Sequence, residues 1–472
     1  MSQNYGYNSD FEEKDFRKFQ AEAFEKSLRE NPNLYIDLIL VDEIFQYYYS
    51  DDLLAKAEQL IACGLNNHPY NSGLHYKKAV IAYEKGCFEE SLTAIQTALS
   101  SQPIQQEYIF LKAQILEGMA KYDEAIETLE ILLSTQLSRA PIYTKMGEIA
   151  QNSFNYGDAR AFYEKALAHD SENEDILYEL CFVLEKQLLF QEAIVLYETY
   201  LDAFPYTEKV WYNLGIIYHK IGENQKAIEA FDFALAIKDT FASAYFNKAR
   251  VCMAMGDYAT AIRTFMEVLS LEKDDKVTLF HTAECYESLE NFKEASNYYL
   301  KAIKLDGRYT EALLGVGFCM EEICRFTEAI FYYRRALETD LDNPEIYLSI
   351  SVCEYRLGNS VEAYNYLELA IKQNPNLLDL WKDWANLLYE HDNLVGAITF
   401  LEEGIKHNPR SAELYYLCAV FMLKARKSRK GIMMLENALL IDSGDWEAVV
   451  AEFPEILDYE GVQDLIKLYL KP

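Results

Sequence analysis

Apolar residues between positions 208 and 234 recur with the period of an α-helix, in two successive runs. The first run has members at i, i+3, i+4 and i+7, namely Trp211, Leu214, Gly215 and Tyr218. Gly222 then interrupts the pattern. A second face of the same kind is formed by Ala227, Ile228, Phe231 and Ala234. The pattern predicts two short amphipathic helices joined by a tight turn, which together form a helical hairpin.

The same pattern recurs along most of the chain with a 34-residue period, without insertion or deletion. It predicts twelve consecutive hairpins over residues 38–445, and we refer to each as a repeat. The predicted repeats begin at Leu38, Ser72, Gln106, Ala140, Glu174, Glu208, Ala242, Lys276, Thr310, Pro344, Leu378 and Ala412.

Three columns, meaning the same position in every repeat, support this register. The eighth position is small in every repeat except the first, which has Phe45. The twentieth position is also small, and its residues are Ala57, Ser91, Ala125, Ala159, Ala193, Ala227, Ala261, Ala295, Ala329, Ala363, Ala397 and Gly431. The twenty-fourth position is large and apolar or aromatic in all twelve repeats, as in Phe231 and Phe265. Small residues let the two helices of a hairpin approach closely, so the columns have a steric reason.

The series W-x2-L-G-x2-Y, then A-x3-F, with its 34-residue period, resembles the tetratricopeptide repeat. The resemblance implies an all-α fold, a right-handed α-solenoid superhelix of twelve 34-residue hairpins. It also implies that the first helices line a concave groove in which family members often bind peptides. The segment that contains FPEIL and GVQDLIKLY, within residues 453–469, resembles the tail of large bacterial cytosolic members of this family.

Repeat arrays need covered ends, because the outer face of a terminal repeat is apolar. We therefore expect three parts: a polar N-terminus and capping helix over 1–37, the repeats over 38–445, and C-terminal capping helices over 446–472. The N-terminal helix is predicted from Lys14 to Glu30, before Asn31-Pro32-Asn33, and residues 1–12 are expected to lie outside it. One of its faces is expected to hold Phe16, Phe19, Ala23 and Phe24. The last helix is predicted over Gly461–Leu470, with Val462, Leu465, Ile466 and Tyr469 on one face.

The 472-residue chain has 44 Lys and Arg against 76 Asp and Glu, a net charge of −32. Such a charge repels phosphate backbones, so we expect no nucleic-acid partner. The same charge is also explained by the solubility of a long exposed surface.

The N-terminus lacks the features of a secretory signal. No uninterrupted apolar stretch is long enough to cross a bilayer. We therefore expect a cytoplasmic protein without a membrane partner.

Motifs for catalysis or metal binding are absent from the sequence. It contains no Cys-x-x-Cys, no His-Glu-x-x-His, no Gly-rich phosphate loop and no Gly-x-Ser-x-Gly. Among the nine cysteines, Cys285, Cys319 and Cys353 share the tenth position of their repeats, which indicates packing in a reduced interior. We predict that the chain is not an enzyme, has no catalytic or metal-binding residues and needs no cofactor.

The predicted groove columns are positions 2, 5, 6, 9, 12 and 13 of each repeat. Position 5 is rich in aromatic residues, either as a binding surface or as packing between neighbouring first helices; both interpretations stay open. Repeats six and seven have no acid in these columns, and we expect the main peptide contact there. Asn213 and Asn247 would bond a peptide backbone, and Arg250 would bind a carboxylate. The predicted groove residues are Lys209, Tyr212, Asn213, Ile216, His219, Phe246, Asn247, Arg250 and Phe280.

Some family members bind the C-terminal carboxylate of a ligand with a set of Lys, Asn and Arg side chains, called a clamp. Lys382 and Asn386 match the first two members of that clamp, but Leu417 stands where the next Asn is required. The clamp is therefore not expected here.

A dense basic patch in repeat twelve contrasts with the acidic chain. Its residues are Lys424, Arg426, Lys427, Arg429 and Lys430. They are either a contact for an acidic partner, including another copy of the chain, or a solvated turn.

The function predicted is a non-catalytic scaffold or adaptor that binds a peptide segment of a protein partner, whose identity the sequence does not give. The alternative is a self-assembling structural subunit that uses its ends, its convex face and the basic patch.

Overall fold

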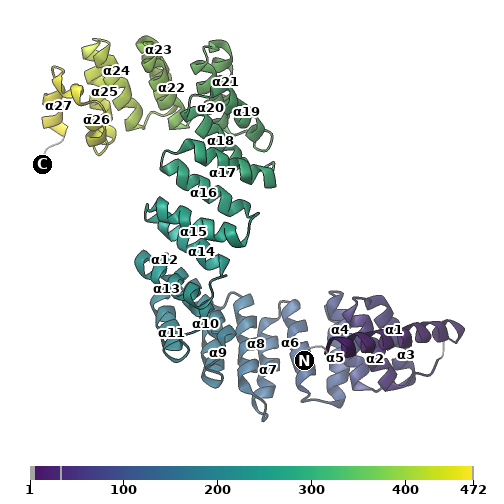
Figure 1. Cartoon of the computed structure of the whole chain (residues 1–472). Coiled ribbons are helices and arrows are strands. Elements are labelled where there is room, and N and C mark those ends of the chain that lie inside the picture. Colours follow the sequence, from purple (N-terminus) through teal and green to yellow (C-terminus); the bar gives the residue numbers. More distant parts are fainter. Residues whose placement is uncertain (1–5, 32–33, 470–472) are drawn as a thin grey trace. The chain divides into compact units, whose positions relative to one another are not determined.

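The computed structural model describes residues 6–31 and 34–469, and within these ranges it holds 27 α-helices, one 3-10 helix and no strand (Figure 1). The predicted all-α solenoid of helical hairpins is confirmed. The helices are α1 Gly6–Glu30, α2 Leu38–Ser50, α3 Leu54–Asn67, α4 Ser72–Glu84, α5 Phe88–Ser101, α6 Gln106–Gly118, α7 Tyr122–Leu133, α8 Arg139–Asn152, α9 Tyr156–His169, α10 Glu174–Lys186, α11 Phe190–Ala203, α12 Glu208–Lys220, α13 Asn224–Ile237, α14 Ala242–Ala254, α15 Tyr258–Leu271, α16 Lys276–Ser288, α17 Phe292–Leu305, α18 Thr310–Glu322, α19 Phe326–Leu337, α20 Pro344–Arg356, α21 Ser360–Gln373, α22 Leu378–Glu390, α23 Leu394–His407, α24 Ala412–Lys424, α25 Ser428–Ile441, α26 Trp446–Glu452, η1 Pro454–Asp458 and α27 Val462–Tyr469.

The chain divides into two compact units, Met1–Gly222 and Glu223–Pro472, called unit 1 and unit 2 below. The division falls in the turn between α12 and α13, inside the sixth hairpin.

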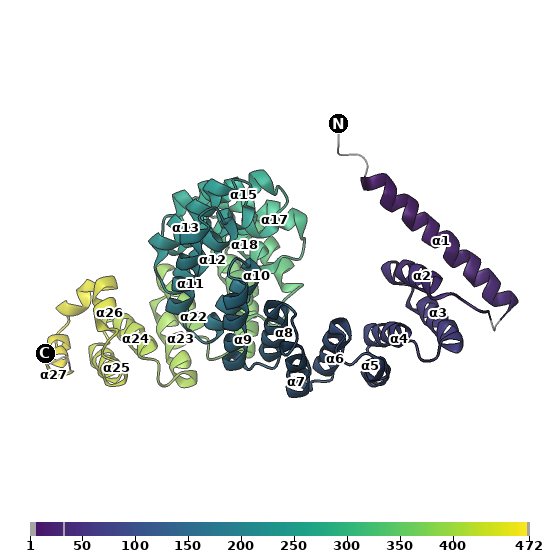
Figure 2. The ribbon, with the colours of Figure 1, turned by 90° about the horizontal axis from the view of Figure 1, so that it is seen from below.

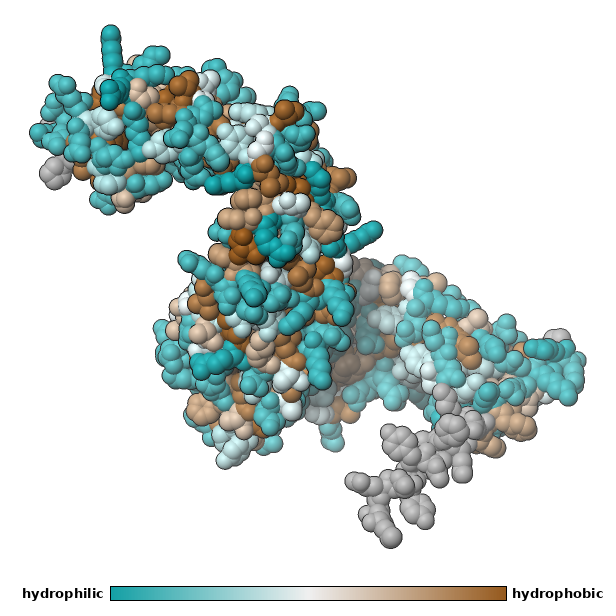
Figure 3. Space-filling view, turned by 45° about the horizontal axis from the view of Figure 1, so that its top comes forward, coloured by the Kyte–Doolittle hydropathy of each residue, from teal (hydrophilic) through white to brown (hydrophobic). Residues whose placement is uncertain are grey.

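Hydrophilic residues cover most of the visible face in Figure 3, with hydrophobic residues in small groups between them. None of the helices in the described ranges combines the length and the apolar character that crossing a bilayer requires.

Even-numbered helices from α2 to α24 are the first helices of the hairpins, and they begin at the predicted residues except α8, which begins at Arg139 instead of Ala140. The turn that follows each first helix has one geometry throughout. The fifteenth residue of every repeat has a positive φ, between 56° and 85°. In repeat three the N–H of Ala120 bonds the carbonyl of Glu117 and the N–H of Lys121 bonds that of Leu116, at 2.8 Å each. This is the Schellman pattern, which satisfies carbonyls at a helix end.

Close approach of the two helices explains the small columns. Every residue of the twentieth position is buried, and the large residues of the twenty-fourth are buried with them. A side chain on Gly147 or Gly317 would overlap the ring of Tyr163 or Tyr333, because its Cβ would lie within 2.7 Å of that ring. Ser91 Oγ also donates to the carbonyl of Ala79 across its hairpin at 2.6 Å. The steric reason inferred from the sequence therefore matches the packing.

The N-terminal helix differs from its prediction. It begins at Gly6, eight residues earlier than predicted, and ends at Glu30 as predicted. Its buried residues are Ala21 and Phe24, while Phe16, Phe19 and Ala23 of the predicted face are exposed. The buried stripe faces α2, where Tyr48 OH donates to Glu25 at 3.0 Å; Figure 2 shows α1 as one long helix beside α2. Residues 1–5, Pro32 and Asn33 of these predictions lie outside the described residues.

At the C-terminal end, α26 begins one full repeat length after α24. It therefore occupies the position that the first helix of a thirteenth repeat would take. It ends after two turns at Glu452, and η1 begins at Pro454 after Phe453. The predicted face of the last helix is correct: Val462 is buried, Leu465 and Ile466 pack on the same core, and Tyr469 OH donates to Glu436 at 3.0 Å. The predicted Leu470 end lies outside the described residues. The division into cap, array and cap stays a prediction.

Seven of the nine cysteines are buried, including the three in the tenth position. Cys87 and Cys324 are exposed. The tenth position lies between neighbouring repeats, and burial there raises the pKa of the Cys285 and Cys319 thiols to about 12. These thiols are therefore neutral core residues.

Candidate peptide-binding groove

Unit 1 has a cavity of about 480 Å³ on the face of its first helices. Three of these helices, α8, α10 and α12, supply all but one of the lining residues. The lining residues are Gln151, Tyr178, Glu179, Phe182, Glu185, Tyr197, Asn213, Ile216 and Lys220. All except Tyr197 occupy the columns that the sequence assigned to the groove. The columns therefore describe a hollow surface in this unit.

The apolar part of the cavity is centred on Phe182. This side chain is 41% exposed, although most large apolar residues of unit 1 are covered. Lys186 Nζ lies 4.9 Å from the centre of its ring, a cation–π contact. Tyr178 and Ile216 are half-buried beside it. The hairpin does not need this phenyl ring for its own packing, so the ring is available to an apolar group from outside.

The polar part of the cavity holds one neutralised ion pair and two unsatisfied polar atoms. Lys220 pairs with Glu185, and Gln151 Nε2 donates to Glu179 Oε2 at 3.0 Å. Gln151 Oε1 and Tyr178 OH are buried without a hydrogen-bond partner in the described part of the chain. Burial raises the pKa of Tyr178, so its hydroxyl stays a neutral donor. An unsatisfied buried polar atom costs free energy, and a ligand that bonds it recovers that cost.

Five predicted groove residues lie in unit 1, all on α12: Lys209, Tyr212, Asn213, Ile216 and His219. Of these, Asn213 and Ile216 line the cavity. The sequence-based site missed the contribution of α10, including Phe182 and Glu185. Both residues occupy the groove columns of repeat five, but that repeat has acids in these columns and so falls outside the acid-free repeats six and seven. Glu185 is acidic, yet Lys220 neutralises it.

The remaining predicted groove residues lie in unit 2, with Phe246, Asn247 and Arg250 on α14 and Phe280 on α16. Phe246 and Phe280 pack on His281, with ring centres 5.7 and 5.5 Å apart. Packing between the neighbouring first helices α14 and α16 therefore accounts for Phe246, whereas Phe280 contacts its own helix neighbour His281 and the ring of Tyr309, 5.2 Å away. Arg250 is exposed and has no ion pair within the described ranges. A single site that joins the α12 residues to those of unit 2 stays a prediction.

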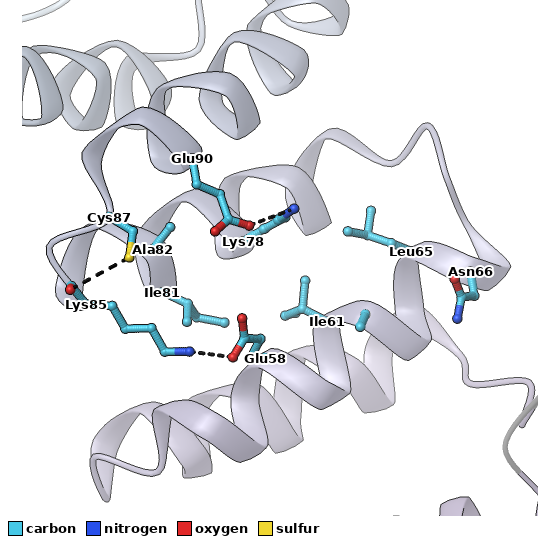
Figure 4. A pocket seen from close by; sticks show the side chains of 11 residues that line it. Glu58, Ile61, Leu65, Asn66, Lys78, Ile81, Ala82, Lys85, Cys87 and Glu90 are labelled. Atoms are coloured by element: carbon cyan, nitrogen blue, oxygen red, sulfur yellow. Dashed lines mark hydrogen bonds and ion pairs between the residues drawn. The ribbon is translucent and has the colours of Figure 1, made fainter.

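A second cavity in unit 1, of about 310 Å³, opens between α3, α4 and α5 (Figure 4). Ile61 and Ile81 form its floor and are almost fully buried. Lys78 pairs with Glu90 at 3.1 Å, and a second pair joins Lys85 to Glu58. Both cations are neutralised, and the lining includes no exposed large apolar residue. This cavity therefore has fewer groups that a partner could contact than the cavity at Phe182.

The basic patch divides into one engaged residue and four exposed ones. Lys424 Nζ lies 2.7 Å from Glu455 and 2.9 Å from Tyr389 OH, which ties the end of α24 to η1. The other four are exposed and form no ion pair within the described ranges, namely Arg426, Lys427, Arg429 and Lys430. Lys424 is therefore a structural contact, and only the remaining four are open to a partner.

Comparison with known proteins identifies the repeats. Models of the tetratricopeptide repeat match residues 140–173, 208–241, 242–275, 278–309 and 325–377. No curated protein matches the chain in sequence.

Solved structures with a similar fold include yeast Tom70, at 15% identity over 92% of this chain and 99% of that one, with a TM-score of 0.39. Another is YrrB, described as a TPR protein with an unusual peptide-binding site, at 20% identity over 40% and 96% and a TM-score of 0.37. A tetratricopeptide repeat protein from Parabacteroides merdae ATCC 43184 has 14% identity over 53% and 98% and a TM-score of 0.38. The matched repeats lie on the helical hairpins described above, and the chain is a tetratricopeptide repeat protein.

Proposed function

We propose that the chain is a non-catalytic scaffold or adaptor that binds a peptide segment of a protein partner at the α8, α10 and α12 cavity. The observation that carries this proposal is the exposed phenyl ring of Phe182 in a cavity whose wall also holds unsatisfied polar atoms. Apolar burial supplies affinity at such a surface, and a few polar groups set the orientation of the ligand.

A peptide bound there has distinct partners for its side chains and its backbone. An apolar side chain would cover Phe182 and Ile216. The amide of Asn213, which has no hydrogen bond within the described residues, would bond the peptide backbone. Tyr178 OH and Gln151 Oε1 offer one donor and one acceptor after a small side-chain shift. The net charge of −32 favours neutral or basic peptides over nucleic acid, and we place the protein in the cytoplasm.

The test is affinity capture from the native source followed by mass spectrometry, with the Phe182→Ala/Ile216→Ala variant beside the native chain. The matched control is Phe331→Ala/Val361→Ala, which removes two exposed apolar side chains from the second helices α19 and α21. A partner that the cavity variant loses and the control retains supports the proposal. Partners shared equally by all three proteins would contradict it.

Self-assembly through the ends, the convex face and the basic patch is the alternative function. It draws support from the four exposed cations at 426–430 in an otherwise acidic chain. Light scattering at two protein concentrations tests it, because the mass of a self-assembling protein rises with concentration. A constant monomer mass leaves the adaptor as the only proposal of the two.

A further inference from the structure

The C-terminal end of unit 2 holds a separate cavity of about 300 Å³ between α22, α24 and α26. Its floor is apolar, with Tyr416, Leu417 and Val420 from α24 buried beneath it. Val449 and Phe453 close the side formed by the truncated thirteenth helix. Figure 1 shows α26 at this end of the chain, near α24. The cavity therefore depends on α26, which stands where a complete repeat would supply a longer helix.

Carboxylates dominate the rim of this cavity. Its lining contains one cation, Lys382, and three acids, Glu413, Asp445 and Glu452. Lys382 Nζ is already held by Glu413 at 2.6 Å and by Asp379 at 3.1 Å. These two carboxylates of the same chain therefore neutralise the charge of Lys382.

Asp445 and Glu452 are different, because neither forms an ion pair within the described ranges. They lie seven residues apart, at the start and the end of α26. Seven residues are about two helical turns, so both face the same side of the helix. Two unneutralised carboxylates therefore border an apolar floor.

We propose that this cavity binds an arginine or lysine side chain of a peptide segment from a protein partner. The aliphatic stem of such a residue fits the floor formed by Tyr416 and Leu417, and its cationic end reaches Asp445 and Glu452. Asn386, half-buried in the wall, has no hydrogen bond within the described chain and is placed to bond the peptide backbone. An anionic ligand is repelled by the same two carboxylates.

This site is independent of the cavity at Phe182, and either can be correct without the other. The site also differs from a carboxylate clamp in the charge of the ligand that it binds, although Lys382 and Asn386 belong to both sites. In the clamp a lysine binds an acidic ligand, whereas here Glu413 and Asp379 neutralise Lys382 and the open groups are acids.

The test uses the full chain and a fluorescein-labelled peptide, acetyl-Ala-Leu-Arg-Leu-Arg-Ala amide, with fluorescence anisotropy as the readout. The control peptide has citrulline in place of both arginines, which keeps the shape and removes the charge. We expect the citrulline peptide to bind about tenfold more weakly, a difference of about 1.4 kcal/mol. Equal affinity of the two peptides, or no binding of the arginine peptide at millimolar concentration, overturns the proposal.

Variants locate the site. Asp445→Asn/Glu452→Gln should remove the preference for arginine, and Ala448→Trp should weaken arginine-peptide binding by filling the cavity without changing charge. The matched control, Glu447→Gln/Glu460→Gln, removes two exposed carboxylates outside the cavity and should retain the preference. Equal losses in both double variants would indicate general attraction to the acidic chain and overturn the site. If Phe182→Ala/Ile216→Ala abolishes binding, the peptide occupies unit 1 instead, which also overturns it.

Discussion

At the scale of single residues, backbone conformation at the turns was the feature least visible in the sequence. All twelve repeats place their fifteenth residue in the left-handed region, yet only four of these residues are glycine, namely Gly86, Gly222, Gly256 and Gly358. A side chain in this conformation costs about 1–2 kcal/mol. The Schellman hydrogen bonds and the buried helices on both sides hold the other eight residues there.

The strain can be measured with Ala120→Gly, which removes only the Cβ of an exposed turn residue with φ of 58°. We expect the free energy of unfolding to rise by up to about 1 kcal/mol, because relief of strain exceeds the added entropy of the unfolded chain. The control is Ala161→Gly, an exposed position inside α9, where a loss of about 1 kcal/mol is expected. Denaturant titration decides: equal losses at both sites would show that the turn carries no strain.

The half-buried carboxyl group of Glu321 gives a second effect at this scale. Tyr333 OH donates to Glu321 at 2.9 Å. Burial raises the pKa of Glu321 above its ordinary value of 4.5, and this outweighs the opposing effect of the hydrogen bond. The folded state therefore binds a proton that the unfolded state has already released, so stability falls as pH rises from 4.5 through the raised pKa.

Glu321→Gln keeps an acceptor for Tyr333 and removes the charge. We expect the variant to be more stable than the native chain at neutral pH and to lose this part of the fall in stability above pH 4.5. Thermal unfolding across pH measures both effects. The exposed Glu362→Gln on α21 serves as the control and should follow the native profile. A native-like profile for Glu321→Gln would mean that this carboxyl is well solvated.

At the scale of elements, α1 shows that helical periodicity alone left two faces to choose from. Phe16 and Phe19 form an apolar group as convincing as the buried stripe of Ala21, Phe24 and Leu28. Packing on α2 selects the second face, because Phe24 shares a buried core with Ile44 and Tyr48, and Tyr48 OH donates to Glu25. Of the four residues on the predicted face, only Phe24 belongs to the stripe that packs on the first repeat.

Phe24→Ala should detach this helix at a cost of about 3 kcal/mol, within the usual range for a buried phenyl ring. Hydrogen exchange would then accelerate in α1 and in the adjoining α2. The same substitution at exposed Phe19 should change neither. Faster exchange in the Phe19→Ala variant alone would place the covering face on the opposite side of the helix.

At the scale of the whole molecule, charge is the property that sets behaviour in solution. The ion pairs are mostly exposed, and such pairs contribute about 0–1 kcal/mol each. They leave an excess of 32 negative charges, which repel one another across the folded surface. Salt screens this repulsion, because the Debye length falls to about 8 Å at physiological ionic strength.

We therefore expect the melting temperature to rise between about 10 mM and about 150 mM sodium chloride. Calorimetry in the two buffers measures the change. Near the pH at which the net charge is zero, the same increase in salt should have little effect or lower the melting temperature. A fall in melting temperature with salt at neutral pH would show that the local ion pairs outweigh the net repulsion.

The hairpins, their 34-residue period and the small and large columns that pack them can all be predicted from the amino-acid sequence. Those features depend on residues within one repeat, whose spacing is local. The tertiary structure alone shows which groove residues are open, because that depends on neighbouring helices: Phe246 of α14 packs on His281 of α16, while Phe182 stays exposed. It also decided which charges are free. Glu413 and Asp379 neutralise Lys382, and Asp445 and Glu452 lack a partner within the described residues, through contacts between helices that no single repeat contains.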